Sequence, residues 1–169
     1  MPFSVVRRVP QGLTLIEILI VMAVAAVLAT VAAPSFQYWL QTQQVNQELE
    51  KLEGALREAQ REAMRRNQAC HVTIPTGSQP TITGNPAACL PTGPRQLENV
   101  TLRRSNTMGT VHFGFQGRSG ADGVAVISLN QVPSLQRCLQ ISPGLGLMRT
   151  GVYAESDTSG TNPENCRER

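Results

Sequence analysis

An apolar segment with one carboxylate near its start dominates this sequence. It runs over residues 13–33, directly after Gly12 and directly before Pro34, and its one ionisable side chain is that of Glu17. As a helix the segment measures about 30 Å, which is the thickness of a bilayer core. A lone ionisable group inside a membrane-length helix is costly and indicates a functional site. If the chain is cut after Gly12, Glu17 lies about one helical turn from the new amine and can neutralise it, in its own chain or in the next subunit.

The residues that flank the apolar segment predict its orientation. Arg7 and Arg8 precede it and no basic residue follows it for a long way, so we expect the N-terminus in the cytoplasm. A secretory signal peptide has a shorter apolar region that ends in a small-residue cleavage site, whereas here the glycine comes first. We therefore expect a leader over residues 1–12, a transmembrane helix over 13–34 and one globular periplasmic domain over 35–169. The formal charge of +3 includes both leader arginines and does not indicate a nucleic-acid binder.

This arrangement resembles the class III signal of type IV prepilins and type II secretion pseudopilins. The shared features are a short basic leader, glycine at the cleavage point, a bulky apolar residue, glutamate four residues later and a proline that closes the apolar stretch. The resemblance implies that a membrane peptidase on the cytoplasmic side of the inner membrane cuts after Gly12 and methylates the amine of Leu13. Many family members begin with phenylalanine, so Leu13 is a departure that this class of peptidase generally tolerates.

The same resemblance implies a mechanism of assembly. The membrane helix would leave the bilayer and pack against the helices of other minor and major pilins, and Glu17 would pair with the amine of an adjacent subunit. An unpaired buried carboxylate costs several kcal/mol, which is why Glu17 needs that partner. An ordinary signal anchor with an incidental Glu17 is the alternative, and Gly12 together with Pro34 speaks against it.

Four cysteines fit the oxidising compartment that this orientation implies. They allow three pairings, of which we favour Cys70–Cys89 with Cys138–Cys166, because each closes a moderate loop around sequence that can bury little apolar surface itself. A loop of this size contributes roughly 3 kcal/mol in the chain-entropy model. Four buried free thiols are the alternative. The sequence has no CxxC pair and no Cys/His cluster, so we expect no zinc site.

A second helical pattern follows the apolar segment. Apolar residues recur there at steps of three and four and form one stripe, which consists of Val45, Leu49, Leu52, Leu56, Ala59 and Ala63. Pro34 should kink the long helix without ending it, and the helical pattern ends at Asn67 and Gln68. The stripe predicts packing on a sheet. A coiled coil is the weaker alternative, because the pattern lasts only about three heptads.

The rest of the chain reads as short strands separated by turns. We predict strands over residues 70–74, 100–104, 110–115, 124–129, 137–141 and 145–149. Residues 75–94 are rich in Pro, Gly, Thr and Ser and predict a long loop or an irregular hairpin. The polar tail from Glu155 is expected to be tethered only by Cys166. The predicted fold class is α+β, with one long kinked helix whose second half packs on an antiparallel sheet.

The end of the helix and the later strands resemble the FimT/FimU/GspH group of minor pilins and pseudopilins. Residues 55–67 are similar to its ARxEAxxRN pattern, and residues 113–117 and 138–144 are similar to its FxxxG and CLxISPxG patterns. This resemblance implies a FimU-like minor type IV pilin that helps to initiate pilus assembly by helix packing. A DNA-binding minor pilin for natural transformation and the H pseudopilin of a type II secretion system are the alternatives.

Arginines bear on the DNA-binding alternative. The FimT-like members that bind DNA carry a C-terminal Gly-Arg-x-Arg element, and the matching stretch here keeps Gly146 and Arg149 but has Leu147 in place of the first arginine. Arg167 and Arg169 are the other possible DNA contacts. So few cationic contacts would give weak, salt-sensitive phosphate binding, and solvated surface charge is the plainer interpretation.

The sequence contains no catalytic constellation that we recognise. His71 and His112 are isolated on predicted strands and are interpreted as structural residues. No G-x-S-x-G element and no glycine-rich phosphate loop is present, and Asp122 and Asp157 both lie in loop sequence. We expect no enzymatic activity, no cofactor and no metal. The expected partners are prepilin peptidase, other pilins, the inner membrane and, weakly, DNA, and the expected final location is the cell surface.

Overall fold

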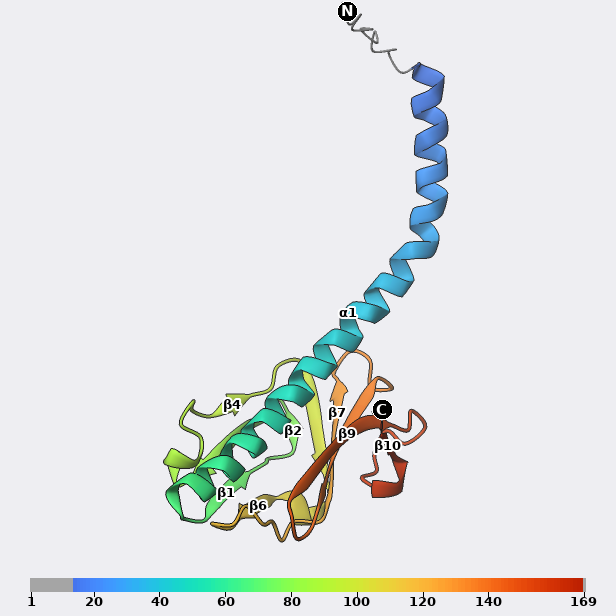
Figure 1. Cartoon of the computed structure of the whole chain (residues 1–169). Coiled ribbons are helices and arrows are strands. Elements are labelled where there is room, and N and C mark those ends of the chain that lie inside the picture. The colour runs from blue at the N-terminus through green and yellow to red at the C-terminus, as the bar shows by residue number, and fades with distance from the viewer. Residues whose placement is uncertain (1–13, 169) are drawn as a thin grey trace, which may run out of the picture. The chain divides into compact units, whose positions relative to one another are not determined.

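The computed structural model describes residues 14–168, apart from the side chains of residues 31–34. Gly12, Leu13 and Arg169 lie outside the described residues, as does the side chain of Pro34. One helix, α1 (Leu15–Arg66), comes first and ten strands follow it (Figure 1). The strands are β1 (Cys70–Thr73), β2 (Gly77–Ser78), β3 (Thr81–Asn85), β4 (Arg95–Gln96), β5 (Val100–Arg104), β6 (Thr110–Phe113), β7 (Gly123–Leu129), β8 (Gln136–Ser142), β9 (Leu147–Tyr153) and β10 (Cys166–Glu168).

The chain divides into two compact units within α1. The first unit ends at Leu40 and the second covers Gln41–Arg169. Among the described residues no single helix is both long and apolar enough to cross a membrane, whereas the bent pair Leu15–Thr30 with Ser35–Arg66 meets those requirements of length and composition together.

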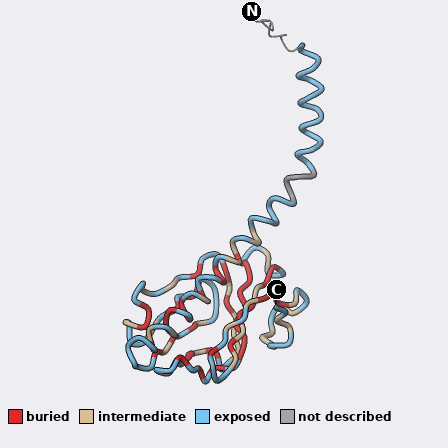
Figure 2. The backbone as a smooth tube through the Cα atoms, viewed as in Figure 1, coloured by how far each residue is buried: buried red, intermediate tan, exposed pale blue. Residues whose placement is uncertain are grey.

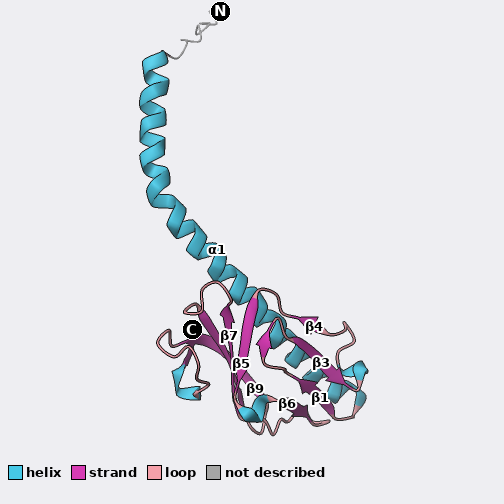
Figure 3. Ribbon diagram, turned by 180° about the vertical axis from the view of Figure 1, so that it is seen from behind, coloured by secondary structure: helices cyan, strands magenta, loops and turns pink. Residues whose placement is uncertain are grey.

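The second unit consists of the later part of α1 and two antiparallel sheets. The smaller sheet has the strand order β4-β3-β1-β6 and the larger has the order β10-β9-β8-β7-β5-β2. The helix lies in front of the strands in Figure 1 and behind them in the reversed view of Figure 3, so it covers one face of the sheet layer. This arrangement confirms the predicted α+β class.

The predicted apolar stripe forms the contact between helix and sheets. All six of its residues are buried, and they join the main hydrophobic core with side chains such as Val72, Leu102 and Ile127. Because the stripe repeats with the helical period, the whole apolar surface of this part of α1 can face the sheets. The helix ends at Arg66, and Asn67 follows with a φ of 53°, the left-handed conformation that often terminates a helix.

Strand β7 is buried on both faces, which is unusual for an antiparallel strand. Ala125, Ile127 and Leu129 belong to the core under α1, whereas Val124 and Val126 pack on the opposite face with Cys138 and Tyr153. The opposite face is covered by the C-terminal segment. The expectation that Cys166 alone tethers the tail is therefore wrong, because β10 also pairs with β9 along Cys166–Glu168.

Two predicted segments differ from the structure in instructive ways. β9 begins at Leu147 and not at residue 145, because Gly144 and Gly146 adopt positive φ values of 89° and 64° and complete the preceding turn. Residues 75–94, which read as a loop or irregular hairpin, contain the five-residue strand β3. By contrast, β5 coincides with the strand predicted over residues 100–104.

Candidate functional site

The described surface of the first unit is apolar and exposed. All described side chains over residues 14–30 and 35–40 are exposed (Figure 2), and they include Leu15 at 77% exposure and Val27 at 67%. A helix that is apolar on every side is stable only where other apolar groups surround it, in a membrane or in an assembly. This surface is therefore the candidate site for contact with lipid or with other subunits.

Glu17 stands in the first turn of this exposed helix. The backbone N–H of Glu17 donates to Oγ1 of Thr14 at 3.3 Å, and Thr14 directly precedes the first helical residue, Leu15. Threonine at the cap with glutamate three residues later is the sequence pattern of a capping box, a signal that our sequence reasoning overlooked. The carboxylate lies in the first turn of the helix, where the helix dipole has its positive end.

Aromatic side chains lie near the end of the first unit. The rings of Phe36 and Trp39 stack with their centroids 5.9 Å apart and their planes 24° apart. Trp39 and Tyr38 are both exposed. Exposed amphipathic rings that follow a long apolar segment are typical of a membrane–water interface.

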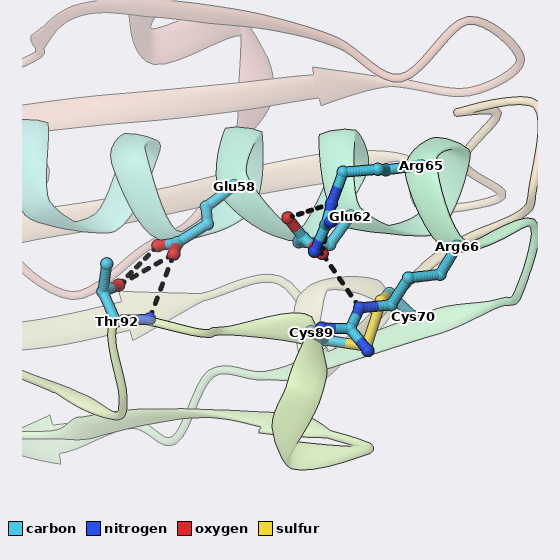
Figure 4. A network of polar contacts seen from close by, with 7 residues as sticks. All are labelled: Glu58, Glu62, Arg65, Arg66, Cys70, Cys89 and Thr92. Carbon is cyan, nitrogen blue, oxygen red and sulfur yellow. Dashed lines mark hydrogen bonds and ion pairs between the residues drawn. A yellow bond between two sulfur atoms is a disulfide. The ribbon is translucent and has the colours of Figure 1, made fainter.

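A buried carboxylate joins α1 to the irregular region before β4. Glu58 accepts hydrogen bonds from the backbone N–H and the hydroxyl of Thr92, at 3.2 and 2.8 Å (Figure 4). It also accepts a hydrogen bond from Arg95 at 2.8 Å. Burial raises the pKa of Glu58, but these hydrogen bonds outweigh that effect and hold the pKa below its ordinary value. The contact secures a segment of the chain that has little regular structure of its own.

Both disulfides join elements that are distant in sequence. Cys70 on β1 bonds Cys89, with their Cα atoms 5.6 Å apart (Figure 4). Cys138 on β8 bonds Cys166 on β10, with their Cα atoms 5.9 Å apart. These are the two pairs that the sequence favours, and the second holds the C-terminal strand beside the large sheet.

A polar cluster folds the C-terminal segment back on itself. Asp157 accepts hydrogen bonds from the hydroxyl of Tyr153 at 2.9 Å, from the N–H of Gly160 at 2.6 Å and from the amide of Asn165 at 2.9 Å. The N–H of Gly160 and the Tyr153 hydroxyl lower the pKa of Asp157. Burial, followed by the hydrogen bond to Asp157, raises the pKa of Tyr153. The loop composition of this segment is the only sequence feature related to the cluster, and it does not predict these contacts.

Of the candidate DNA-contact residues, the structure describes Arg149 and Arg167, and both are exposed. Nη1 of Arg149 lies 2.5 Å from Oε1 of Glu168, and both side chains are more than half exposed. The acidic residue that separates the two C-terminal arginines therefore neutralises Arg149. Arg167 is exposed on β10, opposite Val152 of β9, and Arg169 lies outside the described residues.

The two histidines are neighbours, so the expectation that they are isolated is wrong. His71 on β1 and His112 on β6 are directly opposite each other in the small sheet, and their Nδ1 atoms are in contact. Sequence alone could not reveal this, because the register between strands whose paired histidines are 41 residues apart has no local signal. In the part of the chain that the structure describes, no group of three or more His, Cys, Asp or Glu side chains could hold a metal ion.

Known proteins support the same two features, the N-terminal segment and the fold. Residues 7–33 match the family model of the prokaryotic N-terminal methylation motif. Two crystal structures of the type IV minor pilin FimU of Pseudomonas aeruginosa PAO1, in space groups P65 and P21, resemble the chain with a TM-score of 0.51 and 14% sequence identity. These matches cover 69% and 73% of this chain and 98% of each FimU chain. No curated protein matches the chain.

The chain thus combines a prepilin-type N-terminus with the fold of a type IV minor pilin, which confirms its recognition as a prepilin-like protein. The FimU likeness, at 14% identity, establishes the fold and leaves the role of the chain to be argued from its own residues.

Proposed function

We propose that the chain is a minor type IV pilin that helps to initiate pilus assembly through its N-terminal helix. A prepilin peptidase cuts after Gly12 and methylates Leu13. Residues 13–34 then hold the protein in the inner membrane, with residues 35–169 in the periplasm, until the subunit enters a pilus. The protein acts as a structural subunit and not as an enzyme.

One observation carries this proposal: a helix exposed and apolar on every described side, with a single carboxylate in its first turn, in a chain with the methylation motif. Apolar side chains on all faces leave no face suited to water. The helix can be stored in lipid and later exchange lipid contacts for helix contacts, because both environments are equally apolar. The surface therefore fits a subunit that moves from a membrane to a filament core.

The carboxylate explains how such a subunit would take its position. Removal of the leader creates a positive amine at residue 13, four residues before Glu17. In an apolar filament core each charge needs a partner of opposite sign, because unpaired buried charges cost several kcal/mol. We propose that Glu17 pairs with the amine of the adjacent subunit, which fixes the axial position of one helix against the next. The hydroxyl of Thr14 caps the same turn and keeps it helical up to this point.

DNA binding is the less favoured function. Arg149, the arginine that best matches the DNA-binding element, forms an ion pair with Glu168, and a phosphate would have to displace that carboxylate. The FimU structures that the chain resembles are described as minor pilins, which favours a pilus over a secretion system as the place of assembly.

The test is to replace Glu17 by glutamine in cells that make the pilus. The variant loses the charge but keeps the shape of the side chain, so we expect normal membrane insertion and normal cleavage after Gly12. We expect much less of it in sheared pili than of the wild type. Mass spectrometry of the N-terminus measures processing, and immunoblots of the pilus and membrane fractions measure incorporation.

Thr14→Ala is the matched control, because it removes the helix cap and keeps the carboxylate. If it enters pili normally while Glu17→Gln does not, the charge of Glu17 and not the local helix end is required. Normal incorporation of Glu17→Gln would refute the pairing mechanism. Absence of the wild-type protein from sheared pili would refute the pilus assignment.

A further inference from the structure

The two histidines of this chain form a pair on the outer face of the small sheet. His71 and His112 are the only histidines in the sequence, and β1 and β6 place them directly opposite each other. Their ring centroids are 4.4 Å apart, the ring planes meet at 79°, and the two Nδ1 atoms are in contact. His112 is exposed and His71 is half-buried, so the pair is open to solvent.

We propose that this pair binds a divalent transition-metal ion that prefers imidazole ligands, with Zn²⁺ as the main candidate. Neutral imidazole is a good ligand for Zn²⁺, Cu²⁺ and Ni²⁺. Two nitrogens bound to one tetrahedral Zn²⁺ lie about 3.3 Å apart, so the two Nδ1 atoms, which are in contact, must move apart by rotation of the rings to admit the ion. Water fills the remaining coordination positions on the exposed side.

The backbone under the pair is well fixed, which favours a site that exists before the metal arrives. Val72 and Val111, the neighbours of the two histidines, are fully buried in the core. Cys70, directly before His71, is held by the disulfide to Cys89. The strands therefore present the two imidazoles at one spacing, and the ion does not have to order the chain.

Arg95, on the outer strand β4, is the charged residue of the small sheet. In the small sheet, β1, β3 and β6 contain no acidic or basic residue other than the histidines themselves. Thr73 and Thr110 lie beside the pair on the same face, and Asn85 of β3 is opposite His71. None of these three neighbours is acidic or basic.

The inference is tested with the full chain in a non-ionic detergent, carrying a purification tag without histidine. Isothermal titration with ZnCl₂ at about pH 7.5 should give one Zn²⁺ per chain. His71→Asn and His112→Asn should each weaken binding at least about tenfold. With Cu²⁺ the electron paramagnetic resonance spectrum should show two nitrogen ligands, and the double variant should lack that signal.

Thr110→Ser is the matched control on the same face and should bind Zn²⁺ as the wild type does. Circular dichroism of every variant checks that the domain is folded, and both histidines are exposed enough for asparagine to be accepted. Absence of Zn²⁺ binding by the wild type, or unchanged binding by the double variant, would overturn the proposal. One Zn²⁺ shared by two chains would also overturn it, since the ion would then join two subunits.

Discussion

The two parts of α1 follow one another in a single helix but meet different surroundings. Up to Leu40 every described side chain from Thr14 onward is exposed, whereas from Val45 the apolar stripe is buried against the sheets. The difference lies in the arrangement of apolar residues. The first part is apolar on all sides and the second on one stripe with the helical period. The apolar side chains of the second part can be buried within the chain, whereas those of the first part can be buried only by lipid or by other subunits.

The comparison implies that the two parts contribute unequally to stability. Burial of Leu52 and Leu56, both fully buried, contributes about 1.5–3 kcal/mol each. Leu19 and Leu28, which are 58% and 65% exposed, receive no such contribution from folding. The stability of the second unit should therefore be insensitive to the first part of the helix.

The largest effect is expected from truncating the buried stripe. Leu56→Ala should lower the free energy of unfolding of the second unit by about 2–5 kcal/mol, because it removes buried methyl groups and leaves a cavity. Leu28→Ala makes the same chemical change in the first unit and should leave this free energy unchanged. Guanidinium unfolding of the full chain in detergent, followed by near-ultraviolet circular dichroism, measures both. Equal decreases in the free energy of unfolding for the two variants would contradict the claim that only the second part of α1 stabilises the second unit.

The sequence predicts these two parts of α1 well, because both depend on periodicity along one element. The N-terminal signal and the stripe are local patterns, and β5 could likewise be read from its residues. For the segment that contains β3 the sequence predicts either a long loop or an irregular hairpin, because Gly, Pro and Thr around it indicate turns more strongly than Ile82 indicates a strand. Its pairing with β1 decides its structure.

The features that the sequence does not predict depend on contacts between distant strands. The His71–His112 pair arises from the register of β1 with β6. The closure of the tail requires β10 to approach β9 so closely that a Cβ on Gly151 would lie 2.1 Å from the carbonyl oxygen of Arg167. Gly151 therefore has a specific role, and nothing in its local sequence indicates it.

The second largest effect is expected at the C-terminal tail, which covers the face of β7 opposite α1. The double variant Cys138→Ala with Cys166→Ala should lower the free energy of unfolding by about 3 kcal/mol, as expected for a loop of this length. It should also make residues 154–165 more sensitive to protease, because β10 would then be held without a covalent bond, by its short pairing with β9, the Arg149–Glu168 ion pair and the polar cluster around Asp157. Cleavage rates in the oxidised wild type give the reference. An unchanged rate and stability would mean that the polar cluster around Asp157 holds the tail by itself.

A smaller, pH-dependent effect is expected at Glu58. Because its pKa is lowered in the folded protein, the ionised form stabilises the fold above the ordinary pKa of 4.5, and this stabilisation is lost as the pH falls through the folded value. Glu58→Gln should cost about 1.5–3 kcal/mol at pH 7, the usual contribution of hydrogen bonds to a charged group. The difference between the variant and the wild type should shrink below about pH 4.5. A difference that is constant from pH 7 to pH 3 would mean that shape and not charge matters at this position.

The smallest effect is expected at Arg149, on the charged surface of the second unit. The ion pair with Glu168 is exposed, so Arg149→Ala should change the free energy of unfolding by less than about 0.5 kcal/mol. Binding of short duplex DNA by the wild type should be weak at physiological salt. At low salt, Arg149→Ala should bind DNA more weakly than the wild type does, because each phosphate contact adds about one unit to the slope of log K against log salt. Glu168→Ala is the informative partner, because it frees Arg149 and should raise affinity at low salt. Tight binding by the wild type that Arg149→Ala abolishes would make the second unit, and not the apolar helix, the main functional surface of the chain.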